Sequence, residues 1–105
     1  KTNVELMDGI KDNKIYNIIF NAIDSVEGVK NPHRVVVRNV GHKLKIGADI
    51  EVDGNMSLQE AHELSNKVEE SIRSRIDNLF DVTIHVEPIG DKTIEKEYGI
   101  SRENL

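Results

Sequence analysis

The sequence predicts a small α+β domain in which two helices cover one face of a three-stranded sheet, in the chain order αββαβ. Apolar residues recur at helical spacing over 15–26, whereas β-branched and alternating residues mark two runs, 33–40 and 44–52, on either side of a glycine turn. A capped helical pattern begins at 58 and gives way to alternation within 81–88. With 105 residues and only 4% aromatics, we expect one thin two-layer core of Val, Ile and Leu.

The first predicted helix begins after Asp12 or Asn13, either of which can act as its N-cap, and Gly28 is expected to stop it. Its inward face consists of apolar residues three and four positions apart. These residues are Ile15, Ile18, Ile19, Ala22, Ile23 and Val26. Residues 1–12 end in a polar, turn-prone run, so we expect them to be a lead-in rather than part of the core.

The first two predicted strands form a hairpin. Residues 33–40 follow Pro32 and are rich in β-branched side chains, and a turn from Gly41 to Lys43 ends this strand. Residues 44–52 then alternate between apolar and polar side chains. The second strand is therefore expected to bury one face and to expose the other.

Ser57 is expected to cap the second helix, with the Glu60 side chain reaching back to complete a capping box. The predicted inward stripe extends for about five turns, roughly 30 Å. It comprises Ala61, Leu64, Val68, Ile72, Ile76 and Leu79. Residues 81–88 follow as a third strand, which Pro88 ends.

A helix that connects two strands of one sheet normally makes a right-handed crossover, so the second and third strands are expected to be parallel and the sheet mixed. The arrangement resembles a ferredoxin-like, metallochaperone-like fold without its first strand. Residues 13–88 would form this domain. Residues 89–105 show little periodicity and are expected to be a tail or a short helix.

Composition restricts the possible functions. The chain has no cysteine, which leaves imidazole and carboxylate as its strong metal ligands. The formal net charge of -5, with scattered Lys and Arg, argues against a nucleic-acid partner. No apolar run approaches the ~18 residues needed to cross a bilayer, so we expect this fragment to be soluble. No pattern typical of an enzyme is present, and we expect none of the residues to be catalytic.

Three polar residues are expected to share the sheet face that the helices leave uncovered. Asp49 lies on the polar side of the second strand, and His85 and Glu87 lie on the polar side of the third. Strands about 4.8 Å apart would bring Asp49 within reach of the other two. The trio is a candidate metal site with nitrogen and oxygen ligands; the alternative is three ordinary polar residues on a wet surface.

The other three histidines are less directly placed. His33 stands where the chain enters its first strand and could join the trio, or it could be an ordinary strand-end residue. His62 belongs to a helix on the opposite side of the sheet, so it contributes either to packing or to a site shared with a second chain. His42, in the hairpin turn, is expected to be solvated.

Several motifs resemble the cytosolic C-terminal domain of cation diffusion facilitator transporters. They are ADIEVDGNMSLQEAHELSNKVEESI, the closing DVTIHVEP, the earlier GVKNPHRVVVRNVG, and LMD, which resembles the segment leaving the last membrane helix. The resemblance covers about residues 4–88. EAH in a capped helix together with IHVEP on the last strand is its most specific feature.

The resemblance implies a homodimer of αββαβ domains on the cytoplasmic side of a cell-membrane protein, whose own transmembrane domain exchanges divalent cations for protons. It also implies that divalent ions bind on and between the two chains. The family's metal positions correspond to His33, Asp49, His62, His85 and Glu87. A two-chain site would give His62 a role that one chain cannot.

The chain departs from zinc-exporting relatives at two of these positions. Asp49 stands where many have histidine, and Glu87 where many have aspartate. A carboxylate in place of imidazole makes the site harder, so zinc remains the first expectation with manganese or iron open. We expect a regulatory metal-binding domain; the alternatives are a purely structural dimerisation module and a small ferredoxin-like domain for another ligand.

Overall fold

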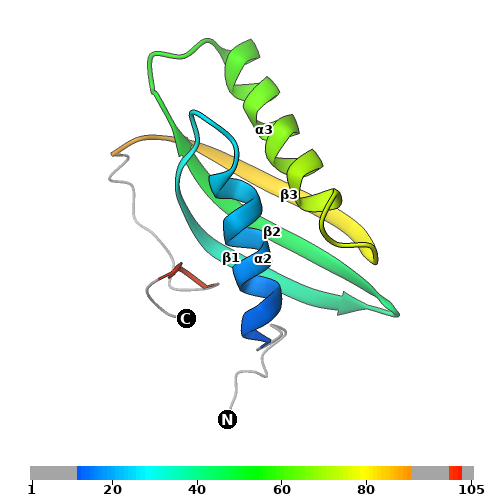
Figure 1. Cartoon of the computed structure of the whole chain (residues 1–105). Coiled ribbons are helices and arrows are strands. Elements are labelled where there is room, and N and C mark those ends of the chain that lie inside the picture. Colours follow the sequence, from blue (N-terminus) through cyan, green and yellow to red (C-terminus); the bar gives the residue numbers. More distant parts are fainter. Residues whose placement is uncertain (1–11, 91–99, 103–105) are drawn as a thin grey trace.

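The computed structural model describes residues 12–90 and 100–102. Its elements are α2 (Asn13–Asp24), β1 (Lys30–Val40), β2 (Lys43–Val52), α3 (Leu58–Arg73) and β3 (Leu79–Pro88). The sheet has the order β1-β2-β3, with β1 antiparallel and β3 parallel to β2. Both helices lie on the same face of this sheet (Figure 1). The predicted αββαβ order and the mixed sheet are thereby confirmed.

The core lies between the helices and the inner face of the sheet. β2 contributes Ile46 and Ile50, both fully buried, because alternate residues of this strand face the helices. α2 buries two aromatic residues that the helical pattern did not place in its face, Tyr16 at 3% exposure and Phe20 at 1%. Burial raises the pKa of the Tyr16 phenol, and a hydrogen bond with the Val37 backbone acts in the opposite direction.

Both helices end earlier than predicted. α2 ends at Asp24 with Ser25 as C-cap, and Gly28, at φ 94°, lies in the turn that follows. α3 ends at Arg73 rather than near Leu79, which is already the first residue of β3. The prediction extended the helix too far because Ile76 continues the apolar spacing of α3. Ile76 is buried, but it lies in the connection between α3 and β3.

The strands are correspondingly longer than predicted. β3 begins at Leu79 because the preceding carbonyl, that of Asn78, already accepts a 2.8 Å hydrogen bond from the Leu44 N–H of β2. β1 begins at Lys30 instead of residue 33.

Residues 1–11 of the expected lead-in, and 91–99 and 103–105 of the expected tail, lie outside the described residues. Ile100 pairs with Val35 of β1 through two backbone hydrogen bonds of 2.7 and 2.9 Å. Arg102 contacts α2, with an ion pair of 2.6 Å to Asp24 and its guanidinium 4.9 Å from the centre of the Phe20 ring. Within the described residues, no helix is both long and apolar enough to span a membrane.

The predicted capping box at the start of α3 is present. The Ser57 hydroxyl accepts a hydrogen bond from the Glu60 N–H at 3.1 Å, and Glu60 Oε1 accepts one from the Ser57 N–H at 3.0 Å. Ser57→Ala is expected to lower the free energy of unfolding by about 1 kcal/mol because it leaves an N–H of the first turn without this acceptor. Urea denaturation followed by circular dichroism measures the change; a loss below about 0.3 kcal/mol would contradict the assigned role of the cap.

Candidate metal centre

The candidate site depends on an irregularity of β1. His33 pairs with Asp49 and Val36 with Gly47, so three steps along β1 match two steps along β2. The extra residue makes a β-bulge, and Arg34 at φ 47° carries the backbone distortion. In a regular strand, neighbouring side chains point to opposite faces. Here both His33 and Arg34 approach Asp49.

The other two strands supply the acidic residues and a second histidine. Asp49 of β2 pairs in register with His85 of β3, and Glu87 lies two residues further along β3. Their side chains therefore emerge on the same face of the sheet. The neighbouring residues Ala48 and Ile50 of β2 are buried in the core under the helices, which lie on one face only (Figure 1). Asp49 therefore points to the face without helices, as the alternation in the sequence predicts.

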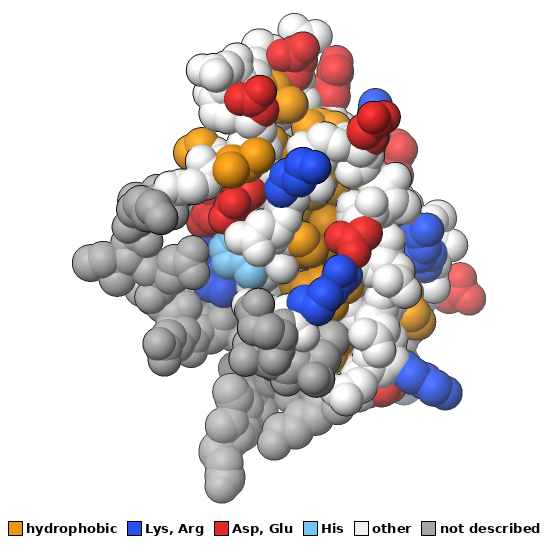
Figure 2. Space-filling model, turned by 60° about the vertical axis from the view of Figure 1, so that its left-hand side comes forward, with side chains coloured by type: hydrophobic (Ala, Val, Ile, Leu, Met, Phe, Trp, Pro, Cys, Tyr) orange, Lys and Arg blue, Asp and Glu red, His pale blue; other side chains and the backbone are white. Residues whose placement is uncertain are grey.

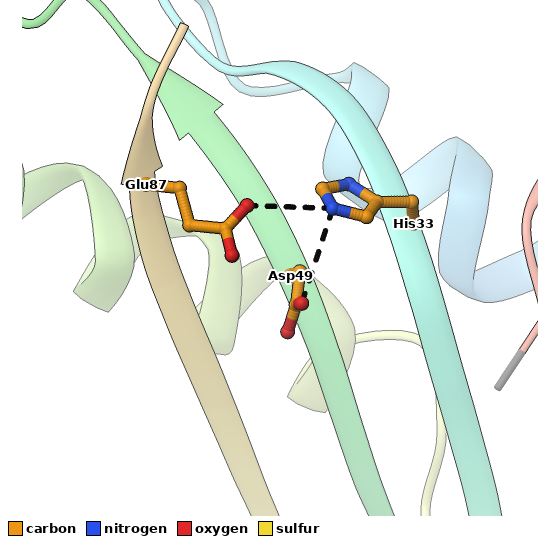
Figure 3. A group of neighbouring side chains, drawn as sticks. All are labelled: His33, Asp49 and Glu87. Carbon is orange, nitrogen blue, oxygen red and sulfur yellow. Dashed lines mark ion pairs between the residues drawn. The ribbon is translucent and has the colours of Figure 1, made fainter. Parts of the chain in front are cut away.

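His33, Asp49 and Glu87 form a close cluster (Figure 3). His33 Nε2 lies 3.4 Å from Glu87 Oε1 and 3.9 Å from Asp49 Oδ2. One potential ligand atom from each residue lies within 4.8 Å of the other two. All three residues are buried, at 5%, 7% and 8% exposure, which is unusual for charged groups unless they are paired or bind metal.

The His33 ring is oriented by the backbone. His33 Nδ1 lies 2.7 Å from the carbonyl oxygen of Asn31. A carbonyl only accepts, so Nδ1 carries the hydrogen and donates it. In the neutral ring, Nε2 therefore presents its lone pair toward the two carboxylates. A histidine whose second nitrogen donates to a backbone carbonyl is the usual arrangement for metal ligation.

Arg34 is the residue of this cluster that sequence reasoning missed. Its Nε donates to Asp49 Oδ2, and its second nitrogen, Nη2, forms ion pairs with Asp49 Oδ2 and, at 2.8 Å, with Glu87 Oε2. The guanidinium thus bridges both carboxylates, with its side chain only 13% exposed. Strict alternation would place Arg34 on the face opposite His33, so only knowledge of the bulge could have revealed it.

The two remaining predicted positions lie apart from the cluster. His85 is on its rim, with Nε2 3.5 Å from Glu87 Oε2 and a side chain that is 65% exposed. His62 is exposed on α3 and is not among the groups that could hold one ion within the described residues. His42 is exposed in the β1–β2 turn.

The donor set determines what the cluster can do chemically. One imidazole nitrogen and two carboxylates suit zinc, manganese or ferrous iron, and they lack the thiolates that would favour softer ions. Three protein ligands leave further coordination positions for water, for His85 or for a second chain. On the face shown in Figure 2, acidic side chains, a histidine and basic side chains lie close together.

Comparison with known proteins shows the family to which the chain belongs. A family model described as the cytoplasmic domain of cation efflux proteins matches residues 12–89. The metal-bound C-terminal domain of the CzcD transporter from Thermotoga maritima is 46% identical, with a TM-score of 0.73, and the alignment covers 79% of this chain and 99% of that one. The cytosolic domain of a cation diffusion facilitator family protein is 47% identical with a TM-score of 0.71, over 75% and 94% of the two chains.

The curated relatives are longer proteins. Metal tolerance protein 2 from Oryza sativa subsp. japonica is 31% identical over 79% of this chain, but the match covers 21% of the rice protein. Protein p34 from Rickettsia rickettsii is 34% identical over 73% of this chain and 24% of its own length. The chain therefore spans about a quarter of the curated relatives it matches.

Proposed function

Because the chain belongs to the cation efflux family as its cytoplasmic domain, we propose that it is a metal-responsive regulatory domain. It binds divalent cations and forms a homodimer, and the bound ions control transport by the membrane domain of the same protein. Zinc is the first expected ion, with manganese and iron as alternatives that the two carboxylates favour. The observation that carries the proposal is the buried cluster of His33, Asp49 and Glu87.

The surroundings of Glu87 support a two-chain arrangement. A groove lined by Leu58, Ala61 and Glu87 connects the first turn of α3 with the end of β3. Leu58, which lines this groove together with Glu87, is 88% exposed, so the groove offers apolar surface to a partner. His62 follows Ala61 on α3. A second copy seated on this groove would offer His62 as a further ligand, which one chain alone does not.

Metal would act by favouring one dimer arrangement over another. A ligand shifts an equilibrium only when it binds one state better, and a site with ligands from two chains binds only the closed state. Without an ion, the acidic groups of two copies repel each other; with an ion, they are drawn together.

Small-angle X-ray scattering of the 105-residue chain during titration with ZnCl₂ or MnCl₂ tests this proposal. We expect the dimer to become more compact as the metal saturates, because the ions link the two copies. His33→Ala should abolish this response. His42→Ala is the matched control, since it removes a solvent-exposed imidazole, and its titration should equal the wild type. Unchanged scattering at saturating metal would reject the proposal.

A purely structural dimerisation module is the second candidate. It is favoured by the ion pairs of Arg34 with Asp49 and Glu87, because they give both carboxylates a cationic partner without metal. Calorimetric titration distinguishes the two functions: a structural module gives no binding heat that depends on His33 or His85.

A further inference from the structure

We propose that Arg34 is a built-in competitor of the metal ion. Its guanidinium holds the two carboxylates of the site in the metal-free chain and must leave when a divalent cation enters. Arg34 thereby determines the ion concentration at which the domain responds. This inference rests on the proposed metal-binding function and names a residue that lowers its affinity for metal.

The competition follows from a shared oxygen atom. Asp49 Oδ2 faces His33 Nε2 at 3.9 Å, so an ion held by both residues would take this oxygen as its ligand. The same Oδ2 already accepts from Nε of Arg34 and forms an ion pair with its Nη2. Donated hydrogens and a metal ion would use the same lone pairs, and both carry positive charge. The two cations therefore exclude each other at Asp49 Oδ2.

The two carboxylate oxygens of Glu87 face different partners, which fits an exchange of the guanidinium for a metal ion. Oε1 faces His33 Nε2 at 3.4 Å, whereas Oε2 accepts from Arg34 at 2.8 Å. The guanidinium fork matches carboxylate oxygens in a way that an ammonium group cannot. The guanidinium of Arg34 thus occupies oxygens of Asp49 and Glu87, while the imidazole of His33 stays in the orientation that an ion would need.

The backbone indicates that this placement is specific. Arg34 has φ 47°, a left-handed conformation that a long side chain rarely adopts and that costs free energy relative to an ordinary strand residue. Such strain persists where surrounding contacts impose it, and it is frequent at functional sites. The bulge that carries it brings Arg34 to the carboxylates beside His33.

The physical consequence is a penalty on binding. When only a fraction of molecules is free to accept the ion, the apparent affinity falls by that fraction. A hydrogen bond to a charged group changes an equilibrium constant by roughly ten- to hundredfold, so losing the bonds of Arg34 should lower the apparent affinity for the ion by a factor of this size. The penalty lowers the affinity of every ion that uses Asp49 Oδ2. Hard cations held only by carboxylates, such as Mg²⁺, bind most weakly and are therefore the first to lose measurable binding.

Isothermal titration of the 105-residue chain with MnCl₂, and separately with MgCl₂, tests the inference. Arg34→Gln should bind Mn²⁺ about ten- to hundredfold more tightly than the wild type and should gain measurable Mg²⁺ binding. Arg34→Lys, which keeps the charge but not the fork, should lie between the two. Arg38→Gln is the matched control: Arg38 is exposed on the same strand beside Lys45, and its removal should leave the affinity unchanged.

The possible outcomes separate the inference from the proposed function. If the wild type binds Mn²⁺ and Arg34→Gln binds it equally or more weakly, Arg34 is not a competitor while metal binding stands. If neither chain binds, both ideas fail. If Arg34→Gln does not fold, Arg34→Lys decides, because an affinity no higher than that of the wild type would reject competition.

A spectroscopic readout follows Arg34 directly. In the metal-free chain, the Arg34 Nε–H donates to Asp49 and should be protected from exchange with water. Saturation with Zn²⁺ should remove this protection as the guanidinium leaves. Protection that survives saturation would overturn the inference, whatever the affinities.

Discussion

Replacing Phe20 with alanine is expected to destabilise the domain by about 3–5 kcal/mol. Phe20 is 1% exposed and is among the largest fully buried side chains of the described core. A domain of this size has only about 5–15 kcal/mol of stability in total. The aromatic side chain would leave a cavity between α2 and the sheet that a core of Val and Ile cannot refill, because neighbouring helices and strands relax only partly.

Urea denaturation at equilibrium measures this loss, with the slope of the transition checked for two-state behaviour. Phe80→Ala is the matched control, because it removes the same side chain at a position that is 56% exposed. We expect it to cost less than about 1 kcal/mol. Equal losses at the two positions would contradict the burial assigned to Phe20.

Replacing Asp49 with alanine is expected to weaken metal binding on the order of a hundredfold or more, because even partners of a metal ligand contribute 10–100-fold. The same change removes the acceptor of the Arg34 Nε and leaves Glu87 as a carboxylate partner of the guanidinium. Breaking a buried charge pair from one side is costly. We therefore expect a loss of about 1–3 kcal/mol in metal-free stability.

Calorimetry with MnCl₂ and urea denaturation without metal measure the two effects of Asp49→Ala separately. Asp81→Ala is the control, since Asp81 is another aspartate that pairs in register with Lys45 far along β3 from Glu87. We expect Asp81→Ala to retain wild-type metal affinity. If Asp49→Ala also retained it, Asp49 would not be a ligand, and the cluster would be structural.

Local patterns were sufficient for most of the fold. The β-branched residues of 33–40 predicted the first strand. Side-chain periods of 3.6 and 2 residues predicted both helices, the second and third strands and the buried face of β2, because a helix or strand repeats its own geometry regardless of its neighbours. The capping box at Ser57 was predicted for the same reason. The end of α3 was not predicted, because Ile76 continues the apolar spacing of the helix. In the structure Ile76 is buried in the connection that follows α3, and this connection pairs with β2 from Asn78 onward.

The candidate site was predicted in part. Alternation placed Asp49, His85 and Glu87 on one face, and the register of β2 with β3 brings them together. His85 lies on the rim of the cluster, however, whereas His33 lies within it. The proposed role of His62 depends on a second chain, and no pattern within one chain predicts where that second chain lies.

The sequence by itself determined the order of elements, the chemistry available to a metal and the face on which the carboxylates emerge, because each depends on residue type and local repetition. Only the tertiary structure decided that His33 and Arg34 both reach Asp49. That decision depends on the register shift between His33 and Val36 in the pairing of β1 with β2. Register is a property of two strands at once, and shifting it by one residue reverses the direction of every side chain.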